Sequence, residues 1–140
     1  MFATILYGVL DRFGSFQFVN AGHVPPLIIR ASGEVDSLTS SNIPVGLFPG
    51  STFEVASAQL RCGDVLLICS DGVTEAHAGG DDMFGETRLR NSLESCSGLM
   101  PEEICRHVVG AVHEFVGNSP QADDLTLAVV RFGPKPEIKD

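Results

Sequence analysis

The chain has 140 residues, of which 44% are hydrophobic, and it contains fifteen glycines and eight prolines. This length is enough for one domain with a buried core, and the composition is typical of a compact fold with many turns. The formal net charge of −9 argues against a nucleic-acid-binding surface. No apolar run approaches the roughly 18 residues of a membrane span, and the first residues lack the basic start of a signal peptide. We therefore expect a cytoplasmic protein that binds neither nucleic acid nor membrane.

The four cysteines do not form a metal-binding or disulfide pattern. No two of them make a CxxC pair, and no histidine lies at zinc-finger spacing from them; they are Cys62, Cys69, Cys96 and Cys105. Reduced thiols in the cytoplasm are the favoured interpretation, with Cys69 as a core residue of an apolar strand.

The first half of the chain predicts a run of antiparallel strands. Apolar and alternating segments separated by turns with glycine or proline are typical of strands joined by hairpins. The predicted strands cover residues 2–10, 15–20, 27–30, 35–38, 53–56 and 65–69. Residues 40–50 contain two prolines and two glycines and predict a loop that packs against the domain.

The second half predicts two helices and a final strand. Residues 76–85 form a polar, glycine-rich loop, and Leu89 and Leu93 then recur at helical spacing within residues 86–96. Pro101 and the two glutamates after it are a helix start, and apolar residues recur at helical spacing to residue 116. Residues 125–132 are the last strand, and a flexible tail is expected over 133–140. Many strands, two helices and one strand predict an α+β layered domain with an antiparallel sheet.

Three carboxylates lie at strand ends. Asp71 follows the buried strand 65–69, and Asp123 and Asp124 precede the last strand. If these strands are antiparallel neighbours, the three carboxylates meet at one end of the sheet, where their charge calls for a cation. Carboxylates are ligands for Mg²⁺, and two such ions can activate a water for phosphoryl transfer. Three carboxylates are too few for a full two-metal site, and ordinary turn aspartates are the alternative.

Five stretches, in this order and spacing, carry a resemblance to a known family: residues 2–11, 20–26, 71–75, 84–85 and 123–127. Together they resemble the later half of a SpoIIE-type serine/threonine phosphatase, a bacterial branch of the metal-dependent protein phosphatase (PPM) family. The resemblance implies a layered antiparallel β-sandwich flanked by helices over residues 1–132. It also implies hydrolysis of phosphoserine or phosphothreonine with two Mn²⁺ or Mg²⁺ ions, on a small anti-anti-sigma-factor-like protein.

The resemblance also assigns roles to single residues. Asp71 matches the metal ligand of the family's Asp-Gly motif, Asp123 matches the ligand ahead of the last strand, and Asp124 is its companion. Asp71 and Asp123 are thus the expected catalytic residues. Around them, Gly72 completes the Asp-Gly motif, and Glu75 either orients a metal-bound water or is a surface acid.

His23 belongs to the Asn-Ala-Gly-His stretch of residues 20–23, where a turn residue that bonds the backbone is favoured over direct chemistry. Ser70 lies beside Asp71 without a Gly-x-Ser-x-Gly setting, which argues against a serine nucleophile.

The chain begins where the family's second half begins. The resemblance implies that the earlier half supplies a further aspartate that bridges both metal ions, together with another helical layer. We therefore expect one weak metal site, little activity of the chain alone, and self-association or a partner chain that covers an apolar sheet face. The alternative is a catalytically incomplete, non-enzymatic regulatory interaction module of the same fold.

Overall fold

The computed structural model describes residues 1–134, so most of the tail predicted from residue 133 lies outside the described residues. Seven strands and three helices occur within residues 1–134. In chain order they are β1 (Ile5–Leu10), β2 (Ser15–Ala21), β3 (Leu27–Ile29), β4 (Val35–Ser37), β5 (Ala56–Gln59), β6 (Val65–Cys69), α1 (Asp71–Thr74), α2 (Gly85–Leu93), α3 (Pro101–Val116) and β7 (Leu127–Arg131).

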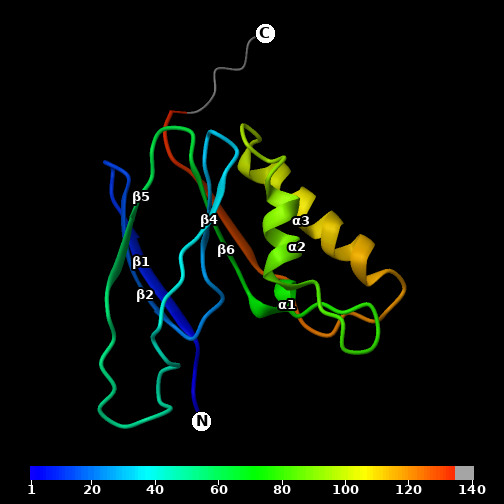
Figure 1. Cartoon of the computed structure of the whole chain (residues 1–140), viewed down its shortest axis with the longest axis horizontal. Helices are drawn as coiled ribbons and strands as arrows, with labels where there is room; N and C mark the ends of the chain where they lie inside the picture. Colours follow the sequence, from blue (N-terminus) through cyan, green and yellow to red (C-terminus); the bar gives the residue numbers. More distant parts are fainter. Residues whose placement is uncertain (135–140) are drawn as a thin grey trace.

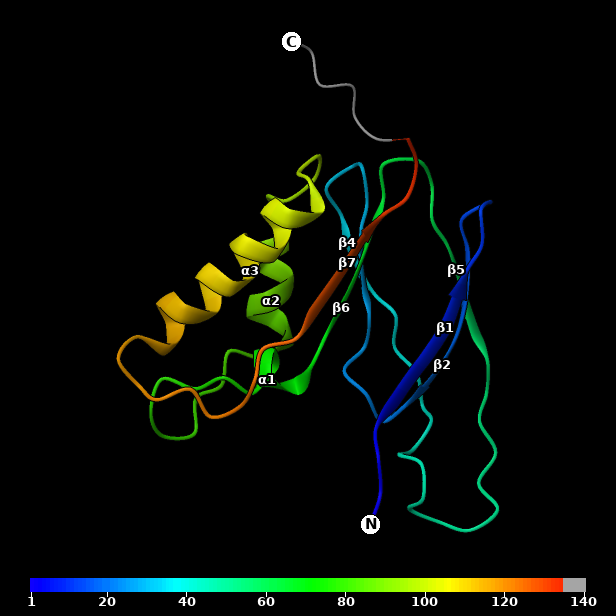
Figure 2. The same ribbon diagram turned by 180° about the vertical axis from the view of Figure 1, so that it is seen from behind.

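The strands form two antiparallel sheets that stack face to face. One sheet has the order β1-β2-β5 and the other has the order β4-β3-β6-β7. Helices α2 and α3 lie on the outer face of the four-stranded sheet (Figure 1), and the view from behind shows α3 running alongside β7 (Figure 2). This arrangement confirms the predicted α+β fold, a layered antiparallel β-sandwich flanked by helices.

The four-stranded sheet is covered on both faces because it is the middle layer. Between the two sheets lies a small core that includes the stacked rings of Phe16 and Phe18, whose centroids are 5.0 Å apart. A larger core between this sheet and the helices includes Ile104 and Val108 of α3. Strand β6 is accordingly buried along most of its length, as its unbroken apolar sequence predicts.

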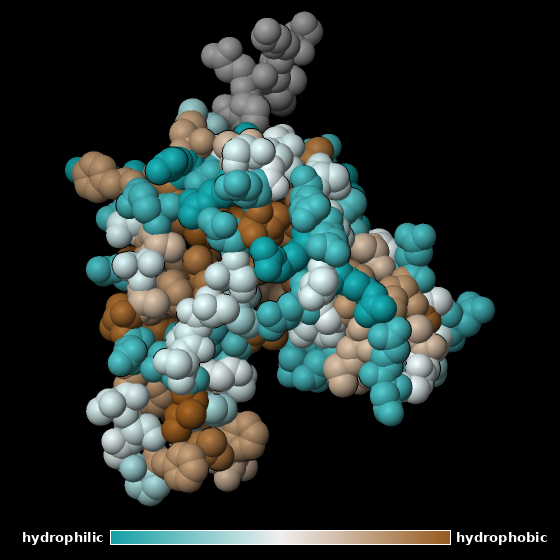
Figure 3. Space-filling view, in the orientation of Figure 1, coloured by the Kyte–Doolittle hydropathy of each residue, from teal (hydrophilic) through white to brown (hydrophobic). Residues whose placement is uncertain are grey.

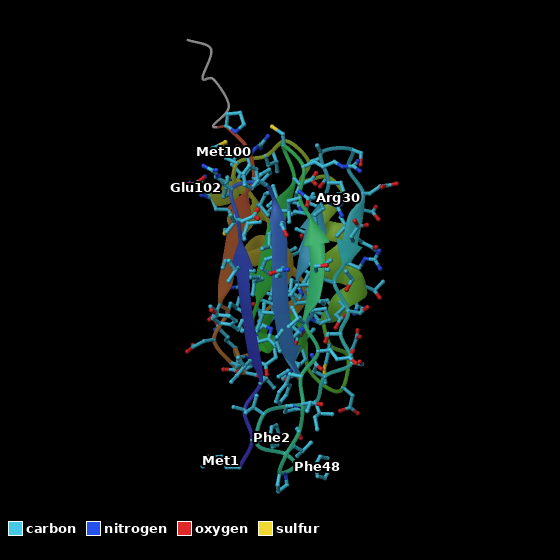
Figure 4. All side chains as sticks on the ribbon, turned by 90° about the vertical axis from the view of Figure 1, so that its left-hand side faces the viewer. Met1, Phe2, Arg30, Phe48, Met100 and Glu102 are labelled. Atoms are coloured by element: carbon cyan, nitrogen blue, oxygen red, sulfur yellow. The ribbon has the colours of Figure 1, made fainter. Side chains whose placement is uncertain are left out.

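The outer face of the β1-β2-β5 sheet has no covering layer among residues 1–134. Ile5, Tyr7 and Val9 alternate along β1 and are 44%, 69% and 55% exposed. Figure 4 looks onto this side of the molecule, and Figure 3 shows brown residues at its edge and at the tip of the loop between β4 and β5. An uncovered apolar face of this kind is typical of an interaction surface.

An ion-pair cluster joins the two sheets at the opposite end from α1. Buried Asp64 accepts hydrogen bonds from the backbone N–H groups of Ala31 (2.9 Å) and Arg61 (2.8 Å) and from the Arg30 guanidinium (2.9 Å). Arg30 also donates to Asp36 at 2.7 Å. Burial alone would raise the pKa of Asp64, but the two backbone hydrogen bonds and the guanidinium outweigh it and hold this pKa below its ordinary value.

Several predicted boundaries are wrong; the last strand, for example, was expected over residues 125–132 and is found at Leu127–Arg131. The strand expected at residues 53–56 is found at Ala56–Gln59, because pairing with β2 aligns Gln59 with Ser15. Residues 53–55 lie in the preceding loop, where the Asn42 side chain bonds both backbone groups of Glu54. The helix expected over residues 86–96 ends at Leu93, and the first strand begins at Ile5.

Candidate functional site

The ends of β6 and β7 bring together the two acidic segments that the sequence analysis singled out. The strands pair antiparallel, with Cys69 opposite Leu127 in the last pair of the register. Asp71 follows β6, and Asp123 and Asp124 precede β7, so both segments leave the sheet at the same end. The expected meeting of these segments is therefore present in the structure.

Ser70 holds the two segments together beyond the last strand pair. Its backbone N–H donates to the Thr126 carbonyl oxygen at 2.9 Å. Its hydroxyl donates to the Asp124 carbonyl oxygen at 3.2 Å and accepts from the Thr126 N–H at 3.1 Å. Sequence reasoning gave Ser70 no role apart from rejecting it as a nucleophile, because a contact with residues more than fifty positions away leaves no local pattern.

Gly72 is required by a close backbone approach. A Cβ atom built on Gly72 would lie 2.1 Å from the carbonyl oxygen of Asp124, well inside van der Waals contact. The Asp71-Gly72 pair begins the four-residue helix α1 directly after β6. Two hydrogen bonds to the Asp71 carbonyl oxygen stabilise this helix. Thr74 Oγ1 donates one at 3.3 Å, and the Glu75 N–H donates the other at 2.7 Å.

The three aspartate side chains are exposed at this end of the sheet. Asp123 Oδ1 accepts a hydrogen bond from the Asp124 N–H at 2.8 Å, which fixes the backbone between them. Within residues 1–134, the carboxylates of Asp71 and Asp124 accept no hydrogen bond and form no salt bridge. Their oxygens are thus available to a ligand from solution.

The donor chemistry fits a hard divalent cation that keeps most of its water. Mg²⁺ and Mn²⁺ prefer carboxylate and water oxygens, and Mg²⁺ is commonly bound through one or two carboxylates. In the described part of the chain, no group of three or more histidine, cysteine, aspartate and glutamate side chains is placed to hold an ion. The residues present therefore suit part of a metal site and not a closed protein cage.

Two further residues that the sequence analysis singled out, Glu75 and His23, lie at this end of the sheet but belong to different segments. Glu75 is exposed directly after α1. His23 lies in the turn that leads into β3, and the antiparallel pairing of β3 with β6 places that turn at the same end of the sheet as Ser70. The buried Asn20 side chain brackets the turn, accepting from the His23 N–H at 2.8 Å and donating to the His23 carbonyl oxygen at 3.0 Å. The His23 ring Nδ1 lies 2.8 Å from the Val24 carbonyl oxygen, as expected for a turn residue that bonds the backbone.

Cys69 is not a nucleophile although it ends the strand that carries Asp71. Burial, with the charge of Glu86 as a smaller cause, raises the pKa of the Cys69 thiol to about 12. All four cysteines are free thiols, as predicted. None of the described helices is long and apolar enough to cross a membrane.

A cavity of about 490 Å³ opens beside the aspartates. Its walls come from α1 and the following loop on one side and from the end of α3 and residues 117–125 on the other. In Figures 1 and 2 these two loops lie next to each other below the helices. This cavity was not predictable from the sequence, because both loops lack periodicity and meet only in the folded chain.

Comparison with known proteins identifies the family. The family described as Stage II sporulation protein E (SpoIIE) matches residues 1–133, so the chain belongs to the SpoIIE family. Protein IcfG of Synechocystis is 32% identical over 138 residues, and Stage II sporulation protein E of Bacillus subtilis is 28% identical over 139 residues. These matches cover 93% and 94% of this chain but only 20% and 16% of those proteins.

Solved structures show the same fold. The phosphatase domain of SpoIIE from Bacillus subtilis, presoaked with Mn, has a TM-score of 0.74 at 25% identity and is matched over 59% of its length by 94% of this chain. The RsbU and RsbW domains of a Mycobacterium tuberculosis protein give a TM-score of 0.73 at 29% identity, with 95% of this chain covering 37% of that one. The fold is therefore that of a PP2C-type phosphatase domain, of which this chain spans a part.

Proposed function

We propose that this chain acts within a metal-dependent protein serine/threonine phosphatase that hydrolyses phosphoserine or phosphothreonine on a small regulatory protein. The observation that carries the proposal is that the Asp71 segment and the Asp123–Asp124 segment leave the β6–β7 pair at the same end of the sheet, in a chain of the SpoIIE family. Exposed carboxylates at a strand end in a phosphatase fold suit binding of the cation that such hydrolysis needs.

Asp71 and Asp123 would hold Mn²⁺ or Mg²⁺, with Asp124 as a further ligand. When bound, such an ion supplies positive charge for the phosphate oxygens and lowers the pKa of a coordinated water. Ser70 and Gly72 do the positioning, because they fix the backbone of the Asp124 segment against α1. Glu75 is available to accept a hydrogen bond from the attacking water, and the Asn20–His23 turn supports the sheet end next to it.

The proposed substrate is a phosphorylated protein similar to an anti-anti-sigma factor. The likeness to a solved chain that carries RsbU and RsbW domains favours a regulatory protein as partner. Four free thiols favour a reducing compartment, so we place this reaction in the cytoplasm.

A second candidate is a catalytically incomplete interaction module of the same fold. One observation favours this candidate. Within residues 1–134, no three histidine, cysteine, aspartate or glutamate side chains are placed so that they could hold a metal ion together. Two-metal hydrolysis needs both ions in position, so the chain alone is expected to turn over a phosphopeptide only slowly.

Isothermal calorimetry with Mn²⁺ tests the site. We expect weak one-site binding that is lost in Asp71→Asn and kept in Asp81→Asn, a matched control at an exposed aspartate of the neighbouring loop. Indistinguishable traces for the native chain and Asp71→Asn would remove Asp71 from the site. Efficient Mn²⁺-dependent turnover of a phosphopeptide by the purified chain would instead show that the further ligands are supplied otherwise, for example by a second copy of the chain.

A further inference from the structure

The cavity next to the aspartates is shaped by two loops that are tied at their ends. The loop of residues 76–84 is closed by the Phe84 N–H, which donates to the Ala76 carbonyl oxygen at 2.7 Å, and by a β-bridge between His77 and Met83. The other loop continues from the end of α3, where the Gly117 N–H donates to the His113 carbonyl oxygen at 2.9 Å. Because both loops are anchored, the cavity between them is a built feature of the fold.

Both apolar and polar side chains line the cavity. Val112, Val116 and Leu125 belong to or pack against the core under the helices, and their side chains form the floor. Met83 is 50% exposed and forms a flexible apolar lip. A volume of about 490 Å³ with an apolar floor is within the usual range of ligand sites.

The mouth of the cavity shares residues with the proposed metal site. Gly72, Glu75 and Asp123 line both. An occupant of the cavity therefore lies directly beside the position where a phosphoryl group would be held. The side chains of Val112, Val116 and Leu125 in the lining favour an uncharged, apolar occupant.

We propose that this cavity binds an apolar side chain of the protein substrate, two residues away from the phosphorylated serine or threonine. The proposal rests on the proposed function, since it takes the phosphoryl group to be held at Asp71 and Asp123. An extended peptide advances about 3.3 Å per residue and points alternate side chains to the same side. The side chain two positions away from the phosphorylated residue therefore points to the same side as the phosphoryl group. It can enter a cavity that shares residues with the proposed metal site.

The methionine methyl groups offer a direct probe. The chain has three methionines, Met1, Met83 and Met100. Only Met83 lines the cavity, and Figure 4 shows Met1 and Met100 at opposite ends of the molecule. With ¹³C-methyl-labelled methionine, a phosphoserine peptide with leucine two positions away should shift the Met83 signal alone. The same peptide with glycine there should bind at least about tenfold more weakly, since a filled apolar pocket discriminates by this much or more.

Two variants complete the test. Ala122→Phe places a ring at the cavity wall and should abolish the Met83 shift, whereas Ala78→Phe, at an exposed position of the other loop and outside the cavity lining, should keep it. Equal responses to the leucine and glycine peptides, no response at Met83, or a shift that survives Ala122→Phe would each overturn the proposal.

The proposed function can fail separately from this inference. If Mn²⁺ binding is insensitive to Asp71→Asn while the Met83 response persists, the metal assignment is wrong and the pocket stands. If Mn²⁺ binding depends on Asp71 while the Met83 methyl signal does not shift on addition of the leucine peptide, the pocket assignment is wrong and the metal assignment is supported.

Discussion

Replacing Gly72 by alanine is expected to destabilise the protein although alanine is the better helix former. The added Cβ would lie 2.1 Å from the Asp124 carbonyl oxygen and 3.0 Å from its carbonyl carbon. Both are backbone atoms, so no side-chain rotation relieves the contact. The segment before β7 must move away from α1, and the hydrogen bonds of Ser70 to that segment must lengthen or break.

The magnitude follows from those hydrogen bonds. Ser70 makes three of them to Asp124 and Thr126, at 2.9, 3.1 and 3.2 Å. Each contributes a net ~0.5–1.5 kcal/mol to the free energy of unfolding. Up to about 1 kcal/mol is regained because alanine is favoured over glycine in a helix. The expected net loss is therefore about 0.5–3.5 kcal/mol, which corresponds to a fall in Tm of roughly 2–12 °C for a domain of this size.

Urea unfolding followed by circular dichroism measures this loss, and Gly110→Ala is the matched control. Gly110 lies inside α3, and a Cβ added there meets no heavy atom within 4 Å. Gly110→Ala should therefore raise the free energy of unfolding by up to about 1 kcal/mol. If Gly72→Ala is as stable as Gly110→Ala, the close approach at Gly72 does not constrain the chain, and the reasoning fails.

Two further predictions concern the ion-pair cluster and the open sheet face. Because the pKa of Asp64 in the folded protein lies below its ordinary value of 3.8, its contribution to stability is present above that value and is lost as the pH falls through the folded pKa. Asp64→Ala should cost about 3 kcal/mol at pH 7 and flatten the acid limb of the stability profile measured by urea unfolding; an unchanged acid limb would contradict this. In sedimentation at micromolar concentration the native chain should self-associate, and Tyr7→Lys with Val9→Lys should raise the monomer fraction. A native chain that sediments as one monomeric, cooperatively melting species would show that the exposed β1 face is not an interface.

Elements whose boundaries depend on local periodicity were predicted well. Strand β6 at Val65–Cys69 and helix α3 at Pro101–Val116 have the predicted bounds. An unbroken apolar run and a proline start followed by regular apolar spacing are signals that tertiary contacts reinforce. The meeting of Asp71 with the Asp123 segment was predictable too, because it follows from antiparallel pairing of two strands whose ends carry the acids.

Features that depend on contacts between distant segments were not predictable. Strand β5 is shifted from the alternating residues 53–56 to Ala56–Gln59, because β2 sets its register. Asn20 is a buried side chain that brackets a turn, yet in the sequence it is one polar residue among several. The cavity next to the aspartates needs two aperiodic loops to meet, and no local signal in either one specifies its partner.

The hydrogen bonds between Ser70 and the Asp124–Thr126 segment have a consequence for the order of folding. Asp71 leaves the ribosome about fifty residues before its partners, and during that interval β6 has no neighbour on the side that β7 later occupies. Docking of the last strand, which closes a long loop and is therefore slow, both pairs that open edge and assembles the acidic end. A nascent or truncated chain that stops before residue 123 would contain the residues of six strands while lacking one of the two acidic segments. The acidic end of the sheet would then be complete only once synthesis has reached the final strand.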